Sequence, residues 1–253
     1  MGGFGTGISS QKNATGGFDS GISLEKLVVS KGIQLYLDSG HNGSYPGSGN
    51  TWFDISGNGK VATLYNTPTY SAGNSGILTF AKASFQYAET TTNLGNMPNW
   101  TVETWIKLSS ALVAGPNAIV TNVFDGVNKL NYALGSMNVA NTNTYAAFFD
   151  GAGWHLHATG QALSLGVWYH LVGTYNGATL SHYVNGTFSN SLSYAGTPQS
   201  GGNTRIARRW DDVANAADNF VGGTIPMVRI YNRALSQAEV TQNFNQSRGR
   251  YGI

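Results

Sequence analysis

The sequence predicts an all-β protein of antiparallel strands that ends in one short helix. Its 253 residues include 34 Gly, 13 Tyr, 11 Phe and 6 Trp, and in such a composition glycines serve turns while aromatic rings cover sheet faces. Asn-Gly, the dipeptide favoured in two-residue hairpin turns, occurs at 176–177 and 185–186 between alternating runs. Ser236 and Glu239 have the spacing of a capping box, which predicts that a helix begins there.

Residues 1–30 are predicted to form a separate, Gly/Ser-rich N-terminal arm. The segment GGFGTGIS returns as GGFDSGIS, so that Phe4 and Ile8 correspond to Phe18 and Ile22. One interpretation is a flexible tail that happens to be repetitive. The other, which we favour, is that the two apolar pairs dock on a larger assembly, because so short an arm cannot bury them alone.

Residues 31–253 are predicted to form one sandwich domain, which begins with a half-buried strand. The run IQLYLD (33–38) alternates apolar and polar residues at the period of a strand. A turn-rich segment follows, and Trp52, Phe53 and Ile55 are expected to attach its loops to the core.

The centre of the chain is predicted to consist of short strands separated by Gly and Asn. The clearest strand, TVETWIKL, places Val102 and Ile106 on one face and Glu103 and Trp105 on the other. Six further runs have strand character: GILTF, FQYAE, AIVTNVF, LNYALGS, TYAAFFD and WHLHATG.

The last third of the domain is predicted to hold a three-stranded meander and the closing helix. The two Asn-Gly turns divide residues 167–193 into three alternating runs. After the strand MVRIYN, the helix is expected to cover 237–247 and to present Val240 and Phe244 on one face.

Composition excludes several classes of function. Charged residues make up 10% of the chain, with 14 Lys and Arg against 12 Asp and Glu, so no basic stripe is present to bind nucleic acid. No apolar stretch reaches the length of a membrane span, and the N-terminus lacks the apolar region of a secretion signal, so we expect synthesis in a cytoplasm and no membrane insertion. The absence of Cys excludes disulfides and thiolate metal sites.

The best candidate carbohydrate site is a cluster around Trp210. An aromatic platform beside planar hydrogen-bonding groups is what sugar recognition needs, and Trp210 is flanked by Arg208, Asp211 and Asp212. Trp154, in DGAGWHLH, is the second candidate platform. The alternative is that a loop aromatic anchors a neighbouring subunit.

Calcium is the cofactor that the loop carboxylates of the sequence would suit. Asp211, Asp212 and Asp218 lie close together in a predicted loop, and Asp54 with Asn58 adds oxygens in another. No EF-hand spacing is present, and the alternative is that these carboxylates are solvated loop residues.

The order of motifs resembles a laminin-G-like domain of the concanavalin A-like lectin/glucanase superfamily. The motifs are GIQLYLDSG, TWFDISGNGKVATLYN, TVETWIK, WYHLVGTYNGATLSHYVNG and MVRIYNRALSQAEVTQNFN, within residues 31 to 250. The resemblance implies a jelly-roll sandwich of two antiparallel sheets, with a short helix packed on it after the last strand.

No catalytic function is expected. The glucanases of this superfamily carry an E-x-D-x-E strand, since retaining hydrolysis needs two carboxylates about 5 Å apart, and this sequence contains no such triplet. His155 and His157 share a strand face without an identifiable third ligand or nucleophile. His170 and His182, on adjacent predicted strands, are interpreted as a cross-strand packing pair.

With its Gly-rich arm, the chain resembles laminin-G-like virion structural proteins of tailed bacteriophages. This resemblance implies a capsid decoration or fibre component at the virion surface, with other virion proteins as partners. Host-surface or environmental glycans are a second expected partner, and a dedicated, calcium-dependent lectin is the alternative function. The sequence fits a monomer and a homo-oligomer equally.

Overall fold

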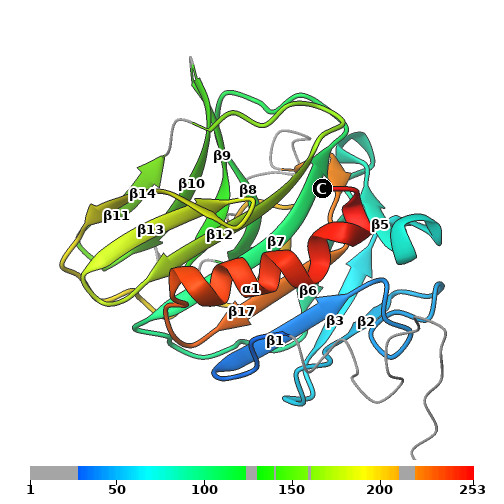
Figure 1. Cartoon of the computed structure of the whole chain (residues 1–253), viewed down its shortest axis with the longest axis horizontal. Helices are drawn as coiled ribbons and strands as arrows, with labels where there is room; N and C mark the ends of the chain where they lie inside the picture. Colours follow the sequence, from blue (N-terminus) through cyan, green and yellow to red (C-terminus); the bar gives the residue numbers. More distant parts are fainter. Residues whose placement is uncertain (1–27, 124–129, 140, 159–160, 211–219) are drawn as a thin grey trace, which may run out of the picture.

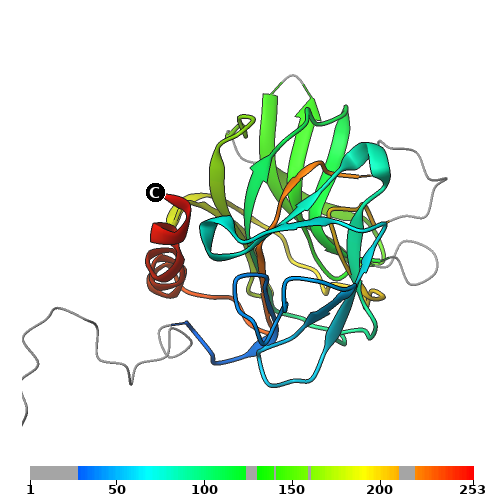
Figure 2. The same ribbon diagram turned by 90° about the vertical axis from the view of Figure 1, so that its right-hand side faces the viewer.

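The computed structural model describes residues 28–123, 130–139, 141–158, 161–210 and 220–253. Within them, two antiparallel β-sheets pack face to face, and α1 (Gln237–Ser247) lies on the outer side of one sheet, as Figures 1 and 2 show. The expected all-β jelly-roll sandwich with a C-terminal helix is therefore confirmed.

The sheet beneath the helix contains nine strands within the described residues, and the opposite sheet contains eight. The nine-stranded sheet consists of β1 (Ile33–Asp38), β4 (Thr69–Ser71), β5 (Ile77–Phe80), β7 (Trp100–Leu108), β12 (Trp168–Tyr175), β13 (Thr179–Val184), β14 (Thr187–Ser193), β16 (Gly223–Thr224) and β17 (Met227–Tyr231). The eight-stranded sheet consists of β2 (Thr51–Phe53), β3 (Val61–Tyr65), β6 (Tyr87–Thr90), β8 (Gly115–Asn122), β9 (Ala133–Val139), β10 (Asn141–Phe149), β11 (Trp154–Ala158) and β15 (Thr204–Ile206).

The strand order brings segments that are distant in the sequence next to one another in each sheet. In the nine-stranded sheet, β14, β13, β12, β7, β16, β5 and β4 follow one another, while β17 pairs with both β7 and β1. In the eight-stranded sheet the order is β11, β10, β9, β8, β15, β6, β3, β2. Short 3-10 helices η2 (Gly73–Ser75), η3 (Lys82–Ser84) and η5 (Arg248–Tyr251) connect or extend the larger elements.

Alternation along β7 sends side chains to two different packing layers. Val102 and Ile106 are fully buried in the core between the sheets. Trp105 points the opposite way, where its ring centroid lies 5.7 Å from that of Phe244 and 4.3 Å from that of Tyr251. The strand is therefore buried on both faces, because a helix covers the outer one.

The predicted meander of β12, β13 and β14 is confirmed, but its two Asn-Gly turns differ. Asn185 and Gly186 have φ values of 49° and 75°, as a type I′ turn requires at both central positions. At the other turn only Gly177 has a positive φ, of 90°. There Asn176 Oδ1 instead accepts a hydrogen bond from the Thr179 N–H, at 2.8 Å, which braces the turn by its side chain.

The closing helix begins where its capping box predicts. Ser236 Oγ accepts a hydrogen bond from the Glu239 N–H at 3.3 Å, and the Glu239 carboxylate accepts one from the Ser236 N–H at 2.9 Å. Val240 and Phe244 are buried against the nine-stranded sheet, as expected. Among the described residues, no helix has the length and apolar character needed to cross a membrane.

Two local expectations are wrong. His170 lies opposite Trp105 of β7 in the sheet register and does not pair with His182, which belongs to a different row of the sheet. Phe53 is 43% exposed, whereas its neighbour Trp52 is fully buried, so of these two rings only that of Trp52 attaches the segment to the core.

Candidate functional site

The outer face of the eight-stranded sheet, on the side away from α1, carries the tryptophans singled out for carbohydrate binding. Along β10, Ala146 and Phe148 point into the core between the sheets, so Tyr145, Ala147 and Phe149 point outward. A separate apolar cluster covers this face. Its buried members are Ala118, Leu130, Ala133, Tyr145, Ala147 and Trp210.

Trp154 and Trp210 lie together on this face. Their ring centroids are 5.0 Å apart, and the Phe149 ring meets that of Trp154 edge-on at 5.8 Å. Trp154 is 41% exposed, but Trp210 is only 6% exposed. The expectation that the Trp210 ring is an exposed platform is therefore wrong. The Trp210 ring is buried and packs against Trp154, and the Trp154 ring is the one exposed to solvent.

A second aromatic group occupies the other half of the same face. Tyr65 and Tyr87 are paired across β3 and β6, and their rings stack at 4.5 Å. The Arg208 guanidinium lies over the rings of Tyr87 and Phe220, at 4.8 and 5.4 Å from their centroids. Arg208 thus contributes to the face by stacking. Tyr65, which is 40% exposed, is the ring at the surface.

An ion pair lies between the two aromatic groups. Arg205 Nε on β15 donates to Glu89 Oε2 on β6 at 2.8 Å. The strand order from β11 to β3 places this ion pair between Trp154 and Tyr65. Glu89 pairs with Thr63, two residues before Tyr65. The row of Arg205 reaches β11 at Leu156, two residues after Trp154, so the three groups lie on a diagonal across the sheet. At about 4.8 Å per strand, β11 and β3 are roughly 29 Å apart across the sheet. Aromatic rings at both ends and a charged hydrogen-bonding pair between them suit an extended, amphipathic ligand.

The remaining predicted site residues lie outside the described residues. These are Asp211 and Asp212 of the carbohydrate cluster, Asp218 of the calcium cluster, and the arm residues Phe4, Ile8, Phe18 and Ile22. Their roles stay predictions.

The other calcium candidate, Asp54, is engaged by the protein itself. Its Oδ1 accepts hydrogen bonds from the N–H groups of Tyr36 and Ser56, at 2.8 and 2.9 Å, and its Oδ2 accepts the Ser56 hydroxyl at 2.7 Å. The carboxylate therefore braces the loop after β2. In the part of the chain that the structure describes, no group of three His, Cys, Asp or Glu side chains could hold a metal ion.

The histidines take part in packing and local ion pairs. His155 Nε2 lies 2.6 Å from Asp150 Oδ2, and this hydrogen bond lowers the pKa of Asp150 to about 2. His157 and His182 are buried in the sandwich, and burial lowers the pKa of both. Among the described histidines, we find none that is placed as the base of a nucleophile.

Comparison with protein families identifies the chain. A family model described as the concanavalin A-like lectin/glucanases superfamily matches residues 82–241, more than half of the sequence. The chain belongs to this family. No curated protein sequence matches it.

Solved structures of similar fold include domain 4 of AbnA, a GH43 extracellular arabinanase from Geobacillus stearothermophilus, in complex with arabinotriose. That match has 16% identity and a TM-score of 0.62 and covers 85% of this chain and 98% of that one. The ligand-binding domain of botulinum neurotoxin serotype D in complex with N-acetylneuraminic acid has 14% identity and a TM-score of 0.66, over 88% of this chain and 52% of that chain. The binding domain of Paraclostridial Mosquitocidal Protein 1 has 16% identity and a TM-score of 0.64, over 85% and 52%. This chain spans about half the length of the two toxin domains, and identities this low indicate a shared fold alone.

Proposed function

We propose that the protein is a non-catalytic glycan-binding module that holds an oligosaccharide across the outer face of its eight-stranded sheet. The observation that carries this proposal is Trp154, a half-exposed ring supported by Trp210 from behind. A tryptophan held in this way offers a large, rigid apolar surface to a sugar ring at little cost in side-chain entropy.

The diagonal of aromatic and charged groups on this face supports an extended ligand. Tyr65 at the far end is a second surface ring, and the pair of Arg205 and Glu89 supplies hydrogen-bonding groups between the two rings. Glu89 is a carboxylate on this face, and its bond to Arg205 favours a binding role over a catalytic one. The solved structures of similar fold in complex with arabinotriose and with N-acetylneuraminic acid add support for a glycan ligand.

The test is a glycan array with the full chain, with and without calcium. Trp154→Ala should abolish specific binding. Phe188→Ala is a matched control, since Phe188 is a 48% exposed ring on the edge strand β14 of the other sheet, and it should leave binding intact. Absence of binding in both calcium conditions, or binding that survives Trp154→Ala, would contradict the proposal. Binding only with calcium would support the metal expected near Asp211, Asp212 and Asp218.

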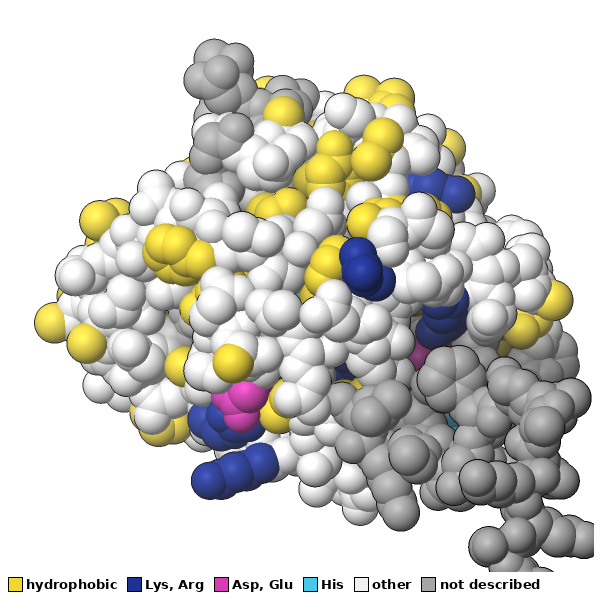
Figure 3. All heavy atoms as spheres, viewed as in Figure 1, with side chains coloured by type: hydrophobic (Ala, Val, Ile, Leu, Met, Phe, Trp, Pro, Cys, Tyr) yellow, Lys and Arg dark blue, Asp and Glu magenta, His cyan; other side chains and the backbone are white. Residues whose placement is uncertain are grey.

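We also propose that this module is part of a bacteriophage particle, where it serves as a capsid decoration or fibre component and displays the sandwich. The repeated Phe and Ile pairs of residues 1–30 support it, since they suit docking on another virion protein. The face that carries α1 is mostly uncharged in Figure 3, with basic side chains in a few separate places, which suits neutral contacts between proteins.

Deletion of residues 1–27 tests this setting. The deletion ends before Val28 and Val29, whose side chains are buried and whose segment hydrogen-bonds to Asn243 of α1, so the sandwich should keep its melting temperature. The full chain should be detected on purified particles by antibody labelling, and the shortened chain should be lost from them. Full-length chain that remains in the soluble lysate, or shortened chain that still labels particles, would contradict it.

A further inference from the structure

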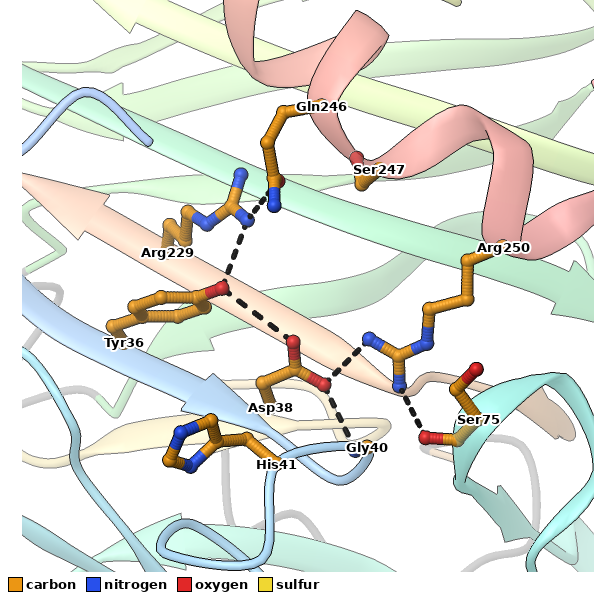
Figure 4. A pocket seen from close by; sticks show the side chains of 9 residues that line it. All are labelled: Tyr36, Asp38, Gly40, His41, Ser75, Arg229, Gln246, Ser247 and Arg250. Atoms are coloured by element: carbon orange, nitrogen blue, oxygen red, sulfur yellow. Dashed lines mark hydrogen bonds and ion pairs between the residues drawn. The ribbon is translucent and has the colours of Figure 1, made fainter. Parts of the chain in front are cut away.

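A polar pocket opens on the helix side of the molecule, on the opposite side from the proposed glycan face. It has a volume of about 530 Å³ and lies between β1 and β17 on one side and the end of α1 with η5 on the other, as Figure 4 shows. This volume is typical of a small-molecule site. The side chains that converge on it come from segments more than two hundred residues apart in the sequence, such as Asp38 and Arg250.

The walls of this pocket are held rigidly. Arg250 Nη1 donates to Asp38 Oδ1 at 2.6 Å, and Arg250 Nη2 donates to the Gly76 carbonyl at 2.7 Å. Arg229, which is 1% exposed, donates to the Tyr36 hydroxyl at 3.0 Å. Side chains fixed in this way lose little entropy when a ligand arrives, so the pocket is preorganised.

The charges around the pocket cancel. Arg250 is paired with Asp38, and Arg229 donates to the buried carboxylate of Glu103 at 2.9 Å. An anionic ligand would meet the Asp38 carboxylate, and a cationic ligand would meet two guanidinium groups. The pocket therefore suits an uncharged ligand.

Two groups at the pocket have hydrogen-bonding capacity that the described residues do not fill: the side-chain amide of Gln246, as a donor, and the carboxylate of Asp38, as an acceptor. Gln246 Oε1 accepts from Arg229 Nη2 at 3.1 Å, and since a guanidinium only donates, this bond fixes the orientation of the amide. Gln246 Nε2 then has no acceptor among the described residues. Within the described part of the chain, Asp38 Oδ2 receives only a long contact of 3.4 Å, from the Tyr36 hydroxyl. Figure 4 shows Gln246 and Asp38 on the border of the same space.

We propose that this pocket binds one neutral sugar unit, separately from the oligosaccharide face. A sugar hydroxyl both donates and accepts, so neighbouring hydroxyls of one ring can donate to Asp38 Oδ2 and accept from Gln246 Nε2. The proposal does not depend on the proposed function, since it uses none of the residues of the eight-stranded sheet.

The experiment is a titration of the full chain with methyl glycosides of glucose, galactose and mannose, and with methyl glucuronoside as the acidic comparison. Binding is followed by the NMR signals of the Gln246 side-chain amide and by calorimetry. Gln246→Glu keeps an oxygen for Arg229 but replaces the donor by a negative acceptor, and it should weaken binding about tenfold or more. Asn245→Asp makes the same change on the exposed neighbouring position of α1 and should leave binding unchanged.

Each outcome decides the proposal. The pocket is supported if a neutral glycoside shifts the Gln246 amide signals and if its binding is weakened about tenfold or more by Gln246→Glu but unchanged by Trp154→Ala. Binding that disappears in Trp154→Ala and persists in Gln246→Glu assigns the sugar to the sheet face and overturns the proposal, while leaving the proposed function standing. Binding of the glucuronoside alone, or of no glycoside, also overturns it.

Discussion

Glu103 of β7 and Arg229 of β17 form an ion pair beneath the C-terminal helix, with Arg229 Nη1 2.9 Å from Glu103 Oε1 and both side chains buried. His170 Nε2 lies 2.9 Å from the same carboxylate oxygen, and Asn243 of α1 donates to the other oxygen at 2.7 Å. Burial alone would raise the pKa of Glu103, but Arg229 and His170 outweigh it, so the pKa is lowered and the carboxylate stays ionised. The pair connects the centre of the sheet to the helix.

Removal of either partner of this pair should be strongly destabilising. Glu103→Leu or Arg229→Leu leaves an uncompensated buried charge, at a cost of about 3–5 kcal/mol. The double variant removes both charges, so it should be more stable than the sum of the two single effects predicts. Urea denaturation of the four proteins measures this coupling. Strict additivity would show that the two side chains stabilise the fold independently.

The sandwich and its closing helix could be predicted because their signals are local. The alternation of TVETWIKL, the two Asn-Gly turns and the capping box of Ser236 each act within a few residues. The alternation also places Glu103 and Trp105 on one face of their strand, but the sequence does not show that α1 covers that face.

The sites could be predicted only in part, because they depend on distant contacts. The sequence singles out both Trp154 and Trp210 as candidate platforms, but it cannot show that Trp210 is buried and Trp154 exposed, because their exposure depends on the sheet beneath them. The Tyr65 and Tyr87 stack and the pocket at Asp38 and Gln246 have no local signal, because their members meet through strand order and helix docking.

Gly186 is predicted to be the glycine least tolerant of substitution among the hairpin turns. It has a φ of +75°, and a Cβ there would lie 2.7 to 2.9 Å from three atoms of Phe244, including its Cβ. Gly186→Ala should therefore cost about 2–4 kcal/mol, from left-handed strain together with overpacking. Gly49→Ala is the control. Gly49 also has a positive φ, of +91°, but a Cβ there would have no atom within 4 Å, so this substitution adds backbone strain without overpacking. Equal losses in urea denaturation would contradict the steric account.

The cap of α1 should make stability depend on acid pH. Two hydrogen bonds from Arg233, at 2.9 and 2.7 Å, together with the N-terminal cap lower the pKa of Glu239 from its ordinary 4.5 to about 2. A lowered carboxyl pKa stabilises the folded state above pH 4.5, and this contribution is lost as the pH falls towards 2. Glu239→Gln should lower the melting temperature at pH 7, and the difference from the native protein should vanish near pH 2. A difference that is constant with pH would contradict this account.

His182 should cause a second loss of stability, at higher pH. It is fully buried in β13 with no hydrogen-bond partner for either ring nitrogen, and burial, with a smaller contribution from His157, lowers its pKa from 6.5 to about 3. Between these values the unfolded chain binds the proton and the folded chain does not, so stability falls as the pH drops below 6.5, by about 1.4 kcal/mol per pH unit. His182→Leu removes this term, so its stability relative to the native protein should rise steadily from pH 7 to pH 5 in urea denaturation. Parallel pH profiles for the two proteins would show that the imidazole finds a proton acceptor inside the folded sandwich.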